Sequence, residues 1–407
     1  MTEKAFWQEL FSAATAVVQP ASCLPAFLPD PSKYDAIKVV AAGKAAAAMI
    51  QCLEETWPTV KVSGFAVCPY GYERPCQKVD VISAAHPVPD ENSVAAAMKA
   101  LKLAAGTGPR ELLLVLLSGG GSSLLCAPID GVSLLEKQKL TADLLASGAT
   151  INDINLVRSY YSRIKAGGLV SSVQEDAEVL TLAISDVVGD DVAKIASGPT
   201  VCAPPAETDV RAVLSRFDVM APSGYFPVER RAFEGHGYHI IASADTMLSK
   251  VREFLTAQDY EVVYLGGDVV GEAREVARAH AAEMRGRAVK NSKTRLAFLS
   301  GGELTVTVKG DGLGGPNQEY LLALMASLPA GQYAGFAADT DGRDGEGGAA
   351  GAFFDADTHI RAAKENRYSE YLQRNNSYNF FNGLSCNFKG IPSFTNVNDL
   401  RVIIYRP

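Results

Sequence analysis

The chain has 407 residues, which exceeds the roughly 250–300 residues at which one hydrophobic core stops growing, so we expect two domains. Hydrophobic residues make up 47% and charged residues 21% of the chain, as in ordinary soluble globular proteins. The formal net charge of −8, without a block of clustered Lys and Arg, argues against nucleic-acid binding, and no apolar run approaches the 18 residues of a membrane span.

The predicted elements begin with an amphipathic helix, because Phe6, Trp7, Leu10 and Phe11 recur at helical spacing. No basic segment precedes them, so we interpret this helix as part of the mature protein rather than a signal peptide. The seven cysteines of the chain are odd in number, scattered and never spaced C-x-x-C. This usage predicts reduced thiols in a cytoplasmic protein.

A short buried strand is predicted over Ala36–Ala42, followed by Gly43-Lys44 and an Ala-rich helix start. A lysine on the first turn of a helix can add its charge to the helix N-terminus to hold an anion. The segment is not a P-loop, since Ala45 stands where Ser or Thr is needed. Lys44 is therefore a candidate anion-binding residue, and an ordinary surface lysine stays open as the alternative.

The apolar run Leu112–Leu117 predicts a parallel strand buried on both faces. A loop rich in glycine and serine follows directly. Its glycines let backbone N–H groups approach a ligand closely and its serines add hydroxyl donors. We interpret it as an anion or phosphate site beyond a strand end, with a flexible turn as the alternative. The loop consists of Ser118, Gly119, Gly120, Gly121, Ser122 and Ser123.

Two further segments of the first half carry polar side chains of interest. A helix is predicted over Ile151–Ile164, with Asn155, Arg158 and Lys165 on a charged face that is either solvated or in contact with a ligand. A buried strand is predicted over 179–184 and ends in an acidic loop that contains Asp186 and Asp190. Carboxylates at the carboxyl end of a strand are placed to bind Mg²⁺ or to accept a substrate proton.

The polar segment Phe226–Gly237 separates two sets of strands, and we place the domain boundary there. The predicted domains are 1–232 and 238–407. Strands and helices alternate through both, so the fold class is α/β, with two domains that each contain a mostly parallel sheet flanked by helices.

In the second half, a strand over 295–299 ends in Ser300-Gly301-Gly302-Glu303, a turn like the one at Ser118. Residues 310–315 then match G-x-G-x-x-G, the dinucleotide-binding fingerprint. The preceding strand argues against that function, because its Val and Thr residues alternate as in a half-exposed strand.

The last predicted strand, over 333–338, ends in a loop with the carboxylates Asp339, Asp341 and Asp344. Their spacing does not fit an EF-hand, but three carboxylates on one loop suit a hydrated Mg²⁺. Together the strand ends offer glycine cradles, a lysine and aspartates, without a recognisable covalent nucleophile. These groups suit phosphoryl transfer, where catalysis is mainly positioning and charge neutralisation.

Nine motifs distributed in order along the chain resemble those of the class II glycerate kinases, which carry a C-terminal MOFRL domain. The motifs are GKAA at 43–46, HPVPDENS at 86–93, LLSGGGSSLLCAPI at 116–129, GATINDINLVR at 148–158, SDVVGDD with IASGPT at 185–200, LSGGELTVTV at 299–308, GGPNQE at 314–319, DTDGRDG at 339–345 and TNVNDL at 395–400. The resemblance implies a Rossmann-like N-terminal domain and a MOFRL region at about 295–402.

The resemblance also implies ATP-dependent phosphorylation of D-glycerate at its 2-hydroxyl with Mg²⁺, in a cleft between the two domains. It assigns catalysis to Lys44, Asp186 and Asp190, with Lys44 either neutralising charge on the transferring phosphoryl group or holding the glycerate carboxylate. The acidic loop supplies Asp339, Asp341 and Asp344 as the predicted metal ligands. Substrate and phosphate binding falls to Ser118 through Ser123, Asn155, Arg158, Glu303, Asn317 and Gln318. We expect D-glycerate and a nucleotide as partners, neither nucleic acid nor membrane, and leave a homodimer open.

The chain departs from the family pattern at two positions where arginine is usual, which are Leu313 and Pro316 here. Arg343 or Arg158 are candidates to replace them. The C-terminal glycine-rich turn is also bulkier here, over 390–394. Two rival functions therefore stay open, an NAD(P)H-dependent hydroxypyruvate reductase and a catalytically inactive ligand-binding relative.

Overall fold

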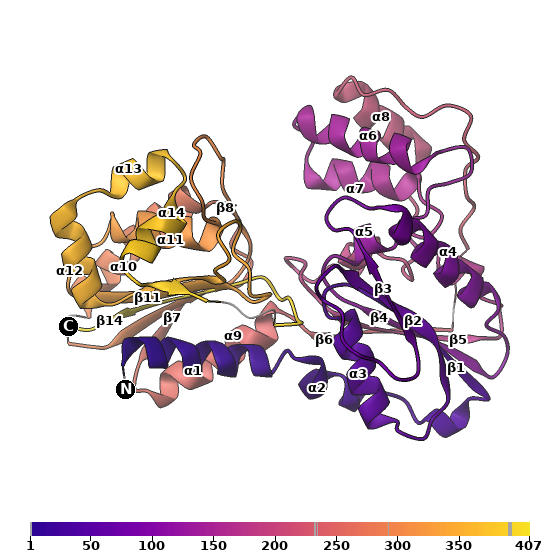
Figure 1. The fold of residues 1–407 in the computed structure, drawn as a ribbon, viewed down its shortest axis with the longest axis horizontal. Coiled ribbons are helices and arrows are strands. Elements are labelled where there is room, and N and C mark those ends of the chain that lie inside the picture. The colour runs from indigo at the N-terminus through magenta and orange to yellow at the C-terminus, as the bar shows by residue number, and fades with distance from the viewer. Residues whose placement is uncertain (1, 232, 234, 292, 390–392) are drawn as a thin grey trace. The chain divides into compact units, whose positions relative to one another are not determined.

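The computed structural model describes residues 2–231, 233, 235–291, 293–389 and 393–407. Within it the chain forms two compact units (Figure 1). The N-terminal unit comprises Pro20–Ile241, and the C-terminal unit comprises Met1–Gln19 together with Ala242–Pro407. The bulky turn noted above begins with residues 390–392, which lie outside the described part of the chain.

This division differs from the predicted domains at the N-terminus, because helix α1 (Glu3–Ala16) belongs to the C-terminal unit. Its aromatic side chains explain the difference. Trp7 is fully buried and stacks on Phe336 with ring centroids 5.7 Å apart, and Phe6 lies 5.7 Å from Phe254. The predicted boundary segment 226–237 lies close to the observed division, and its residues 232 and 234 lie outside the described residues.

The N-terminal unit is built on a six-stranded sheet of order β3-β2-β1-β4-β5-β6. The four pairings from β3 through β5 are parallel, as the apolar runs predict. Every residue of β4 after the first is buried, which is the pattern of a strand covered on both faces. The strands are β1 (Ala36–Ala42), β2 (Val62–Pro69), β3 (Asp80–Ala84), β4 (Glu111–Leu117), β5 (Glu178–Ile184) and β6 (His236–Ala242).

Helices cover both faces of this sheet, with α3 (Ala46–Thr56) on one side and α4 (Glu91–Ala105) on the other (Figure 1). The remaining helices α6, α7 and α8 form a helical cluster with a small apolar core of its own. Their bounds are Leu134–Ala146, Ile151–Tyr160 and Glu207–Arg216. Helix α7 thus ends four residues before the predicted end, at Tyr160 rather than Ile164. The residues that follow Tyr160 therefore leave the path of the predicted helix.

The strand order makes β1 and β4 neighbours although the chain visits β2 and β3 between them. The connections leave β1 and β4 toward opposite edges of the sheet. Such a reversal is a topological switch point, and open α/β sheets bind ligands beyond the carboxyl ends of the strands there.

The C-terminal unit has a six-stranded sheet of order β13-β12-β11-β14-β9-β7. Only β7 and β9 pair in parallel, and the other four pairings are antiparallel. The prediction of a second mostly parallel sheet is therefore wrong. Two features cause this: β14 enters between β9 and β11 against their direction, and β12 runs antiparallel to both β11 and β13. The strands are β7 (Glu261–Gly266), β9 (Leu296–Ser300), β11 (Tyr333–Asp339), β12 (Gly351–Phe354), β13 (Asn387–Phe388) and β14 (Asp399–Tyr405).

Helices α1 and α9 lie on one face of this sheet, and α10, α11 and α14 lie on the other (Figure 1). A two-stranded sheet of β8 and β10 stands beside it. The bounds are α9 (Ala244–Ala257), β8 (Gly271–Glu272), α10 (Ala273–Lys290), β10 (Leu304–Thr305), α11 (Pro316–Met325), α12 (Ala356–Glu365), α13 (Tyr368–Gln373) and α14 (Ser377–Gly383).

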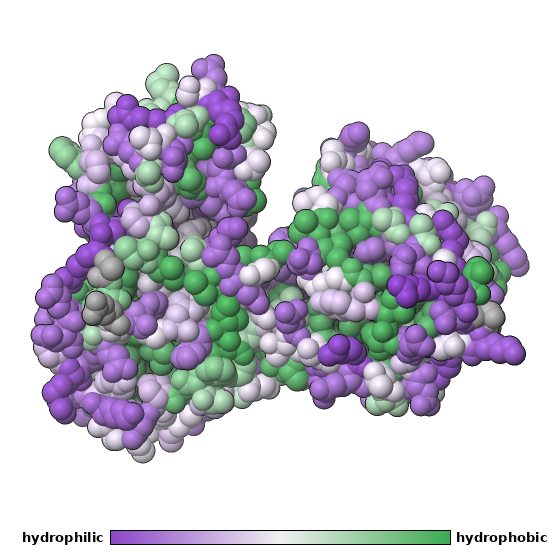
Figure 2. Space-filling view, turned by 180° about the vertical axis from the view of Figure 1, so that it is seen from behind, coloured by the Kyte–Doolittle hydropathy of each residue, from purple (hydrophilic) through white to green (hydrophobic). Residues whose placement is uncertain are grey.

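Polar side chains dominate the outer surface of the helical cluster in the view of Figure 2, with apolar residues showing between them. Within the described residues, no single helix is long and apolar enough to cross a membrane. Only the bent pair Glu3–Ala16 and Pro20–Phe27, taken together, reaches that length and composition.

Candidate active site

The loops after β1 and β4 meet at the switch point of the N-terminal sheet. The backbone N–H of Lys44 donates to the carbonyl of Gly119 at 2.8 Å, and the N–H of Ala45 donates to the Ser118 hydroxyl at 3.0 Å. Lys44 is therefore attached to the glycine-serine loop through its own backbone, because the two loops follow neighbouring strands.

This close approach explains the glycine at position 43. Its φ is +129°, and a Cβ there would lie 2.2 Å from the Ser118 hydroxyl oxygen and 2.5 Å from its carbonyl oxygen. Any side chain would push the two loops apart. Ser118 itself is fully buried, so its hydroxyl joins the loops.

The glycine-serine loop continues into the short helix α5 (Gly121–Leu124). Ser123 is buried and donates back to the carbonyl of Gly120 at 3.1 Å. A Cβ on Gly121 would lie 2.9 Å from the Cβ of Ala196. Ser118 and Ser123 are thus used inside the loop, and among the loop's serines only Ser122 is partly exposed.

Two cationic side chains and a second serine converge on Ser122. The Lys165 ammonium lies 2.7 Å from the Ser122 hydroxyl oxygen, and an Arg158 guanidinium nitrogen lies 3.2 Å from it. The Ser197 hydroxyl lies 2.8 Å away, and Arg158 also donates to the Asn155 side chain at 3.3 Å. The structure thus brings the predicted residues Ser122, Asn155 and Arg158 together.

This cluster is electropositive and lacks a compensating carboxylate. Among the ion pairs of the described residues, none involves Lys137, Arg158 or Lys165. Burial and the neighbouring Arg158 and Lys137 charges hold the pKa of Lys165 well below its usual range. Burial also lowers the pKa of Lys137 to about 8 and lowers the pKa of Arg158. Such surroundings favour an anion.

Sequence reasoning placed Lys165 on a charged helix face, either solvated or in contact with a ligand, whereas the structure buries it to 1% exposure. Helix α7 ends at Tyr160, so the next residues leave the helical path and turn inward. The signal was present, because Ala166-Gly167-Gly168 follows directly, and glycines after a helical pattern mark its end. Gly167 has a φ of +86°.

Asp186 and Asp190 follow β5, which pairs with β4 in the sheet. They therefore stand at the same sheet edge as Lys44 and the glycine-serine loop. Asp190 adopts a left-handed φ of 53°, and its N–H donates to the carbonyl of Val187 at 3.0 Å in a tight turn. Both carboxylates stay candidates for contact with a ligand.

The three carboxylates predicted to bind a metal are not arranged as one three-carboxylate site within the described part of the chain. The Asp344 oxygens accept the backbone N–H groups of Asn317 and Gln318, at 3.0 and 2.9 Å, in the first turn of α11. Asp339 accepts the N–H of Asp341 at 2.8 Å, a local turn bond. Across the described ranges, no group of three or more His, Cys, Asp or Glu side chains is arranged to hold a metal ion. Asp344 instead caps a helix whose N-terminus attracts negative charge.

Asn317 and Gln318, predicted to bind substrate, lie in the core of the C-terminal unit with at most 1% exposure. Asn317 donates to Asp399 at 2.6 Å, and Gln318 donates to Asn387 at 2.8 Å. Their side-chain carbonyl oxygens are buried without a hydrogen-bond partner. Glu303, the remaining candidate of this unit, is exposed in the loop after β9.

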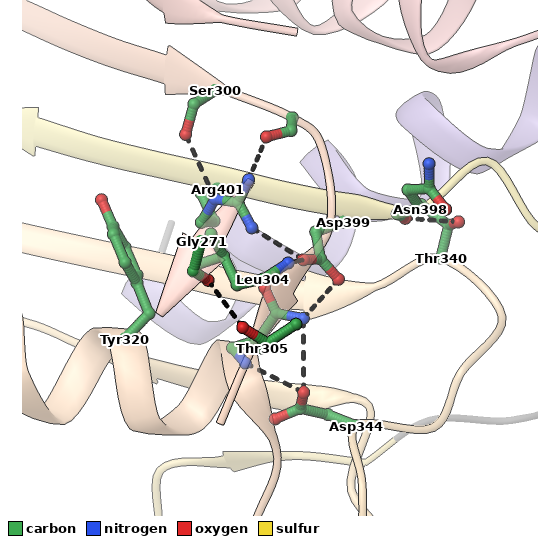
Figure 3. Close-up of polar contacts among 12 residues, drawn as sticks. Gly271, Ser300, Leu304, Thr305, Tyr320, Thr340, Asp344, Asn398, Asp399 and Arg401 are labelled. Carbon is green, nitrogen blue, oxygen red and sulfur yellow. Dashed lines mark hydrogen bonds and ion pairs between the residues drawn. The ribbon is translucent and has the colours of Figure 1, made fainter. Parts of the chain in front are cut away.

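Asp399 opens β14 and pairs with Arg401 at 2.7 Å (Figure 3). Arg401 also donates to the Ser300 hydroxyl at 3.2 Å and to the Gly301 carbonyl. Both residues of the ion pair are buried. Burial raises the pKa of Asp399, and it raises the pKa of Asp344 to about 7.

The glycines at 310–315 are required by packing. A Cβ on Gly310 would lie 2.3 Å from the Arg374 backbone, and one on Gly312 would lie 2.5 Å from the Asn376 Cα. The preceding strand β10 has two residues and pairs only with β8, so no Rossmann unit surrounds this segment. Leu313 and Pro316, the two departures noted in the sequence analysis, line a cavity of about 510 Å³ here.

Comparison with protein families places the chain. Residues 6–224 match a family described as a domain of unknown function, DUF4147, and residues 296–399 match the MOFRL family. A D-glycerate 2-kinase of Thermotoga maritima is 35% identical over 378 residues, covering 90% of this chain and 90% of that protein. The chain belongs to the MOFRL glycerate kinase family.

Two further matches, one to a solved structure and one to a protein sequence, extend over nearly the whole chain. The crystal structure of glycerate kinase from Thermotoga maritima is 31% identical, covers 99% of each chain and superposes with a TM-score of 0.89. A protein of Agrobacterium vitis named "Putative hydroxypyruvate reductase" is 37% identical over 98% of this chain and 93% of its own length. The resemblance based on sequence motifs and the α/β fold class are therefore confirmed.

Proposed function

We propose that this protein is a kinase that transfers the terminal phosphoryl group of ATP to the 2-hydroxyl of D-glycerate, giving 2-phosphoglycerate and ADP. One observation carries the proposal. The Lys44 backbone and the Arg158 and Lys165 side chains contact a single glycine-serine loop at the switch point of the N-terminal sheet, and among the described residues no carboxylate pairs with Arg158 or Lys165. The similarity to glycerate kinases over nearly the whole chain supports the same activity.

The reaction forms a bond between the substrate 2-oxygen and the γ-phosphorus, and it breaks the bond from that phosphorus to the bridging oxygen of ADP. Lys44 neutralises the negative charge of the transferring phosphoryl group. The N–H groups and hydroxyls of Ser118 through Ser123 bind the oxygen atoms of the ligands and hold them in place. The 2-hydroxyl proton must leave, and Asp186 is the carboxylate that we assign to accept it. Asp190 then orients the substrate.

Mg²⁺ accompanies nucleotide triphosphates and is held largely by phosphate oxygens and water. Asp339, Asp341 and Asp344 do not fit a resident Mg²⁺ as a set, because the oxygens of Asp344 are bonded to helix N–H groups. We therefore assign no step to a protein-bound metal. Among the acidic residues, Asp186 and Asp190 are the ones that we propose to approach a nucleotide-bound ion.

We further propose that the reaction takes place in the cytoplasm. All seven cysteines are free thiols, in keeping with a reducing compartment. The small-molecule partners are D-glycerate and ATP, and a homodimer is the oligomeric state that we would test first by light scattering.

The deciding experiment measures ADP release by the purified protein with MgATP and D-glycerate, with L-glycerate, tartronate and hydroxypyruvate as alternatives. NMR of the product distinguishes 2- from 3-phosphoglycerate. Formation of 2-phosphoglycerate that requires Lys44 is the expected result. Lys44-independent turnover, or no ADP with any acid, would overturn the proposal.

The name of the Agrobacterium relative favours a test for reductase activity in parallel. Loss of absorbance at 340 nm with NADH or NADPH and hydroxypyruvate, in the absence of ATP, would identify a reductase. We expect no such loss of absorbance, because the protein's own backbone occupies the space beside the glycines of the dinucleotide-like motif.

A further inference from the structure

Lys165 is a buried cation that pairs with no carboxylate among the residues that the structure describes. Its ammonium donates to the hydroxyl of Ser122, at 2.7 Å, and to the carbonyl of the same residue. Both acceptors are neutral. Arg158 likewise bonds only to the neutral oxygens of Ser122 and Asn155. Placing two cations beside one hydroxyl is costly unless a negative charge joins them.

The neighbouring Lys137 shows what a purely structural cation looks like here. Its ammonium donates to the carbonyls of Arg158 and Tyr161, at 2.9 and 2.6 Å, and so satisfies backbone acceptors at the end of α7. A cation near a helix C-terminus is stabilised by the helix dipole. Lys165 differs, because both of its acceptors are atoms of one residue, Ser122 in the short helix α5, and one of them is a side-chain hydroxyl.

Hydrogen-bond accounting fixes the orientation of the hydroxyls. Arginine and lysine only donate, so Arg158 and Lys165 occupy both lone pairs of the Ser122 oxygen. The Ser122 hydrogen must then point to the Ser197 oxygen, 2.8 Å away. Ser197 is buried, and no other described residue bonds to its hydroxyl. Its own hydrogen stays available to an acceptor from outside the protein.

The backbone around Ser197 is held in an uncommon conformation. Ala196, Ser197 and Gly198 have consecutive positive φ values of 50°, 61° and 58°. Non-glycine residues in this region cost free energy and persist where the surroundings demand them, often at functional sites. Here the turn brings the Ser197 hydroxyl against Ser122 and the Ala196 methyl group against Gly121.

We propose that Lys165 and Ser197 complete, with Arg158 and Ser122, a receptor for the carboxylate of the acid substrate. The inference rests on the proposed function, and it identifies the residues that make the enzyme prefer a substrate with a carboxylate. Arg158 has further N–H groups for a two-oxygen acceptor, and Lys165 has a third N–H. Lys44 is bonded at Gly119, three residues earlier in the same loop. One loop thus joins a phosphoryl-facing cation to a carboxylate receptor, as phosphorylation of a hydroxyl next to a carboxylate requires.

Calorimetric titration of the full-length protein with D-glycerate and with D-glyceramide, its neutral amide, tests the assignment. Loss of one charged hydrogen bond corresponds to about tenfold to hundredfold weaker binding. We expect Lys165→Met to weaken D-glycerate binding by about this factor and to leave D-glyceramide nearly unchanged. Lys165→Arg should restore most of the preference for the acid, because it retains the charge.

The matched control is Arg163→Gln, which removes a positive charge two residues away whose partner is Asp130 at 3.3 Å. It should leave the preference for the acid intact. If Lys165→Met does not fold, Lys165→Arg and Ser197→Ala carry the test, with Ser197→Ala expected to lower D-glycerate affinity several-fold. An equal loss for both ligands in these variants would show a merely structural role and overturn the proposal.

A second arm separates the carboxylate from a phosphate. Affinities for inorganic phosphate and for MgATP should be unchanged in Lys165→Met. Weaker MgATP binding with unchanged D-glycerate binding would assign the receptor to the nucleotide and overturn the inference. A wild-type protein that does not bind D-glycerate would overturn the proposed function as well, whereas wild-type turnover with an unaltered preference in Lys165→Met would overturn the inference alone.

Discussion

The two units contain the same three-residue sequence, Ser-Gly-Gly, directly after a buried strand, but in opposite surroundings. After β4, the loop that begins at Ser118 contacts two cations, Arg158 and Lys165, which pair with no carboxylate among the described residues. After β9, the loop that begins at Ser300 receives the guanidinium of Arg401, whose charge Asp399 neutralises at 2.7 Å. The first loop is left to attract an anion, whereas the second is electrostatically complete.

The glycines of the two loops show the same contrast. A Cβ on Gly302 would lie 2.2 Å from the backbone oxygen of Val269, so the second loop is closed by rigid backbone. A Cβ on Gly120 would meet only the His86 ring, at 3.0 Å. A side chain can move away and backbone cannot. The comparison teaches that a glycine-serine motif becomes a binding loop through the charges placed around it.

The largest expected effect concerns the buried pair of the second loop. Arg401→Leu leaves Asp399 buried without its partner, which costs about 3–5 kcal/mol. The two tryptophans make this measurable, because Trp7 lies in the C-terminal unit and Trp57 in the N-terminal unit. In a Trp57→Phe background, urea titration followed by Trp7 fluorescence reports the C-terminal unit alone.

The control for this variant is Arg367→Leu, in the same unit, because Arg367 pairs with Glu370 at the surface. It should cost less than about 1 kcal/mol. Equal losses in Arg401→Leu and Arg367→Leu would remove the distinction between the two loops.

The next effect concerns the first loop. Lys44→Ala should lower kcat by about 10²–10³-fold, as expected when one group that stabilises transition-state charge is removed. Initial rates of ADP release measure it, and both tryptophan reporters should show unchanged stability. Lys139→Ala, which removes an exposed lysine paired with Asp143 in α6, should leave kcat nearly unchanged. A similar fall in both variants would contradict a specific role for Lys44.

Two serine substitutions, one in each loop, should have intermediate effects, one on stability and the other on the KM for D-glycerate. Ser300→Ala deprives the buried Arg401 of an acceptor, so the C-terminal unit should lose about 1–3 kcal/mol while activity persists. Ser122→Ala should raise the KM for D-glycerate about tenfold through weaker positioning of Arg158 and Lys165. Denaturation curves and steady-state kinetics on both variants decide the matter, and an exchange of the two phenotypes would refute the assignment.

The last prediction concerns the pH dependence of the C-terminal unit. The raised pKa values of Asp344, to about 7, and of Asp399 mean that the folded unit binds more protons than the unfolded chain above pH 4. Its free energy of unfolding should therefore fall as pH rises from about 4 to 7, by at most about 1.4 kcal/mol per pH unit for each group. Urea titrations across this range should show a shallower slope for Asp344→Asn, and an unchanged slope would exclude Asp344 as its source.

The strands of the N-terminal sheet could be predicted from the sequence because the patterns that indicate them are local. The uninterrupted apolar run of β4 predicts burial on both faces, and the turn residues that follow it mark the strand end. Lys44 and the glycine-serine loop follow strands that prove to be neighbours, so their proximity could be anticipated. Strand order itself depends on contacts between distant residues, and the sequence pattern does not contain it.

The C-terminal unit shows where such reasoning fails. The seven residues of β14 are all buried, a pattern that does not reveal strand direction. The spacing of Asp339, Asp341 and Asp344 suggested a metal site, but the N–H groups that engage Asp344 come from Asn317 and Gln318, 27 and 26 residues earlier. Lys165 was missed because the predicted helix ran four residues too long.

The placement of α1 has a consequence for biosynthesis. Its aromatic face packs in a unit whose central strand β14 starts 383 residues after α1 ends, from 16 to 399. At about 5–20 residues per second, a ribosome needs roughly 20–80 seconds to cover that distance. The N-terminal unit lies entirely within this interval and can fold during it. Phe6 and Trp7 are therefore synthesised well before Phe254 and Phe336, the aromatic residues that they contact in the folded unit.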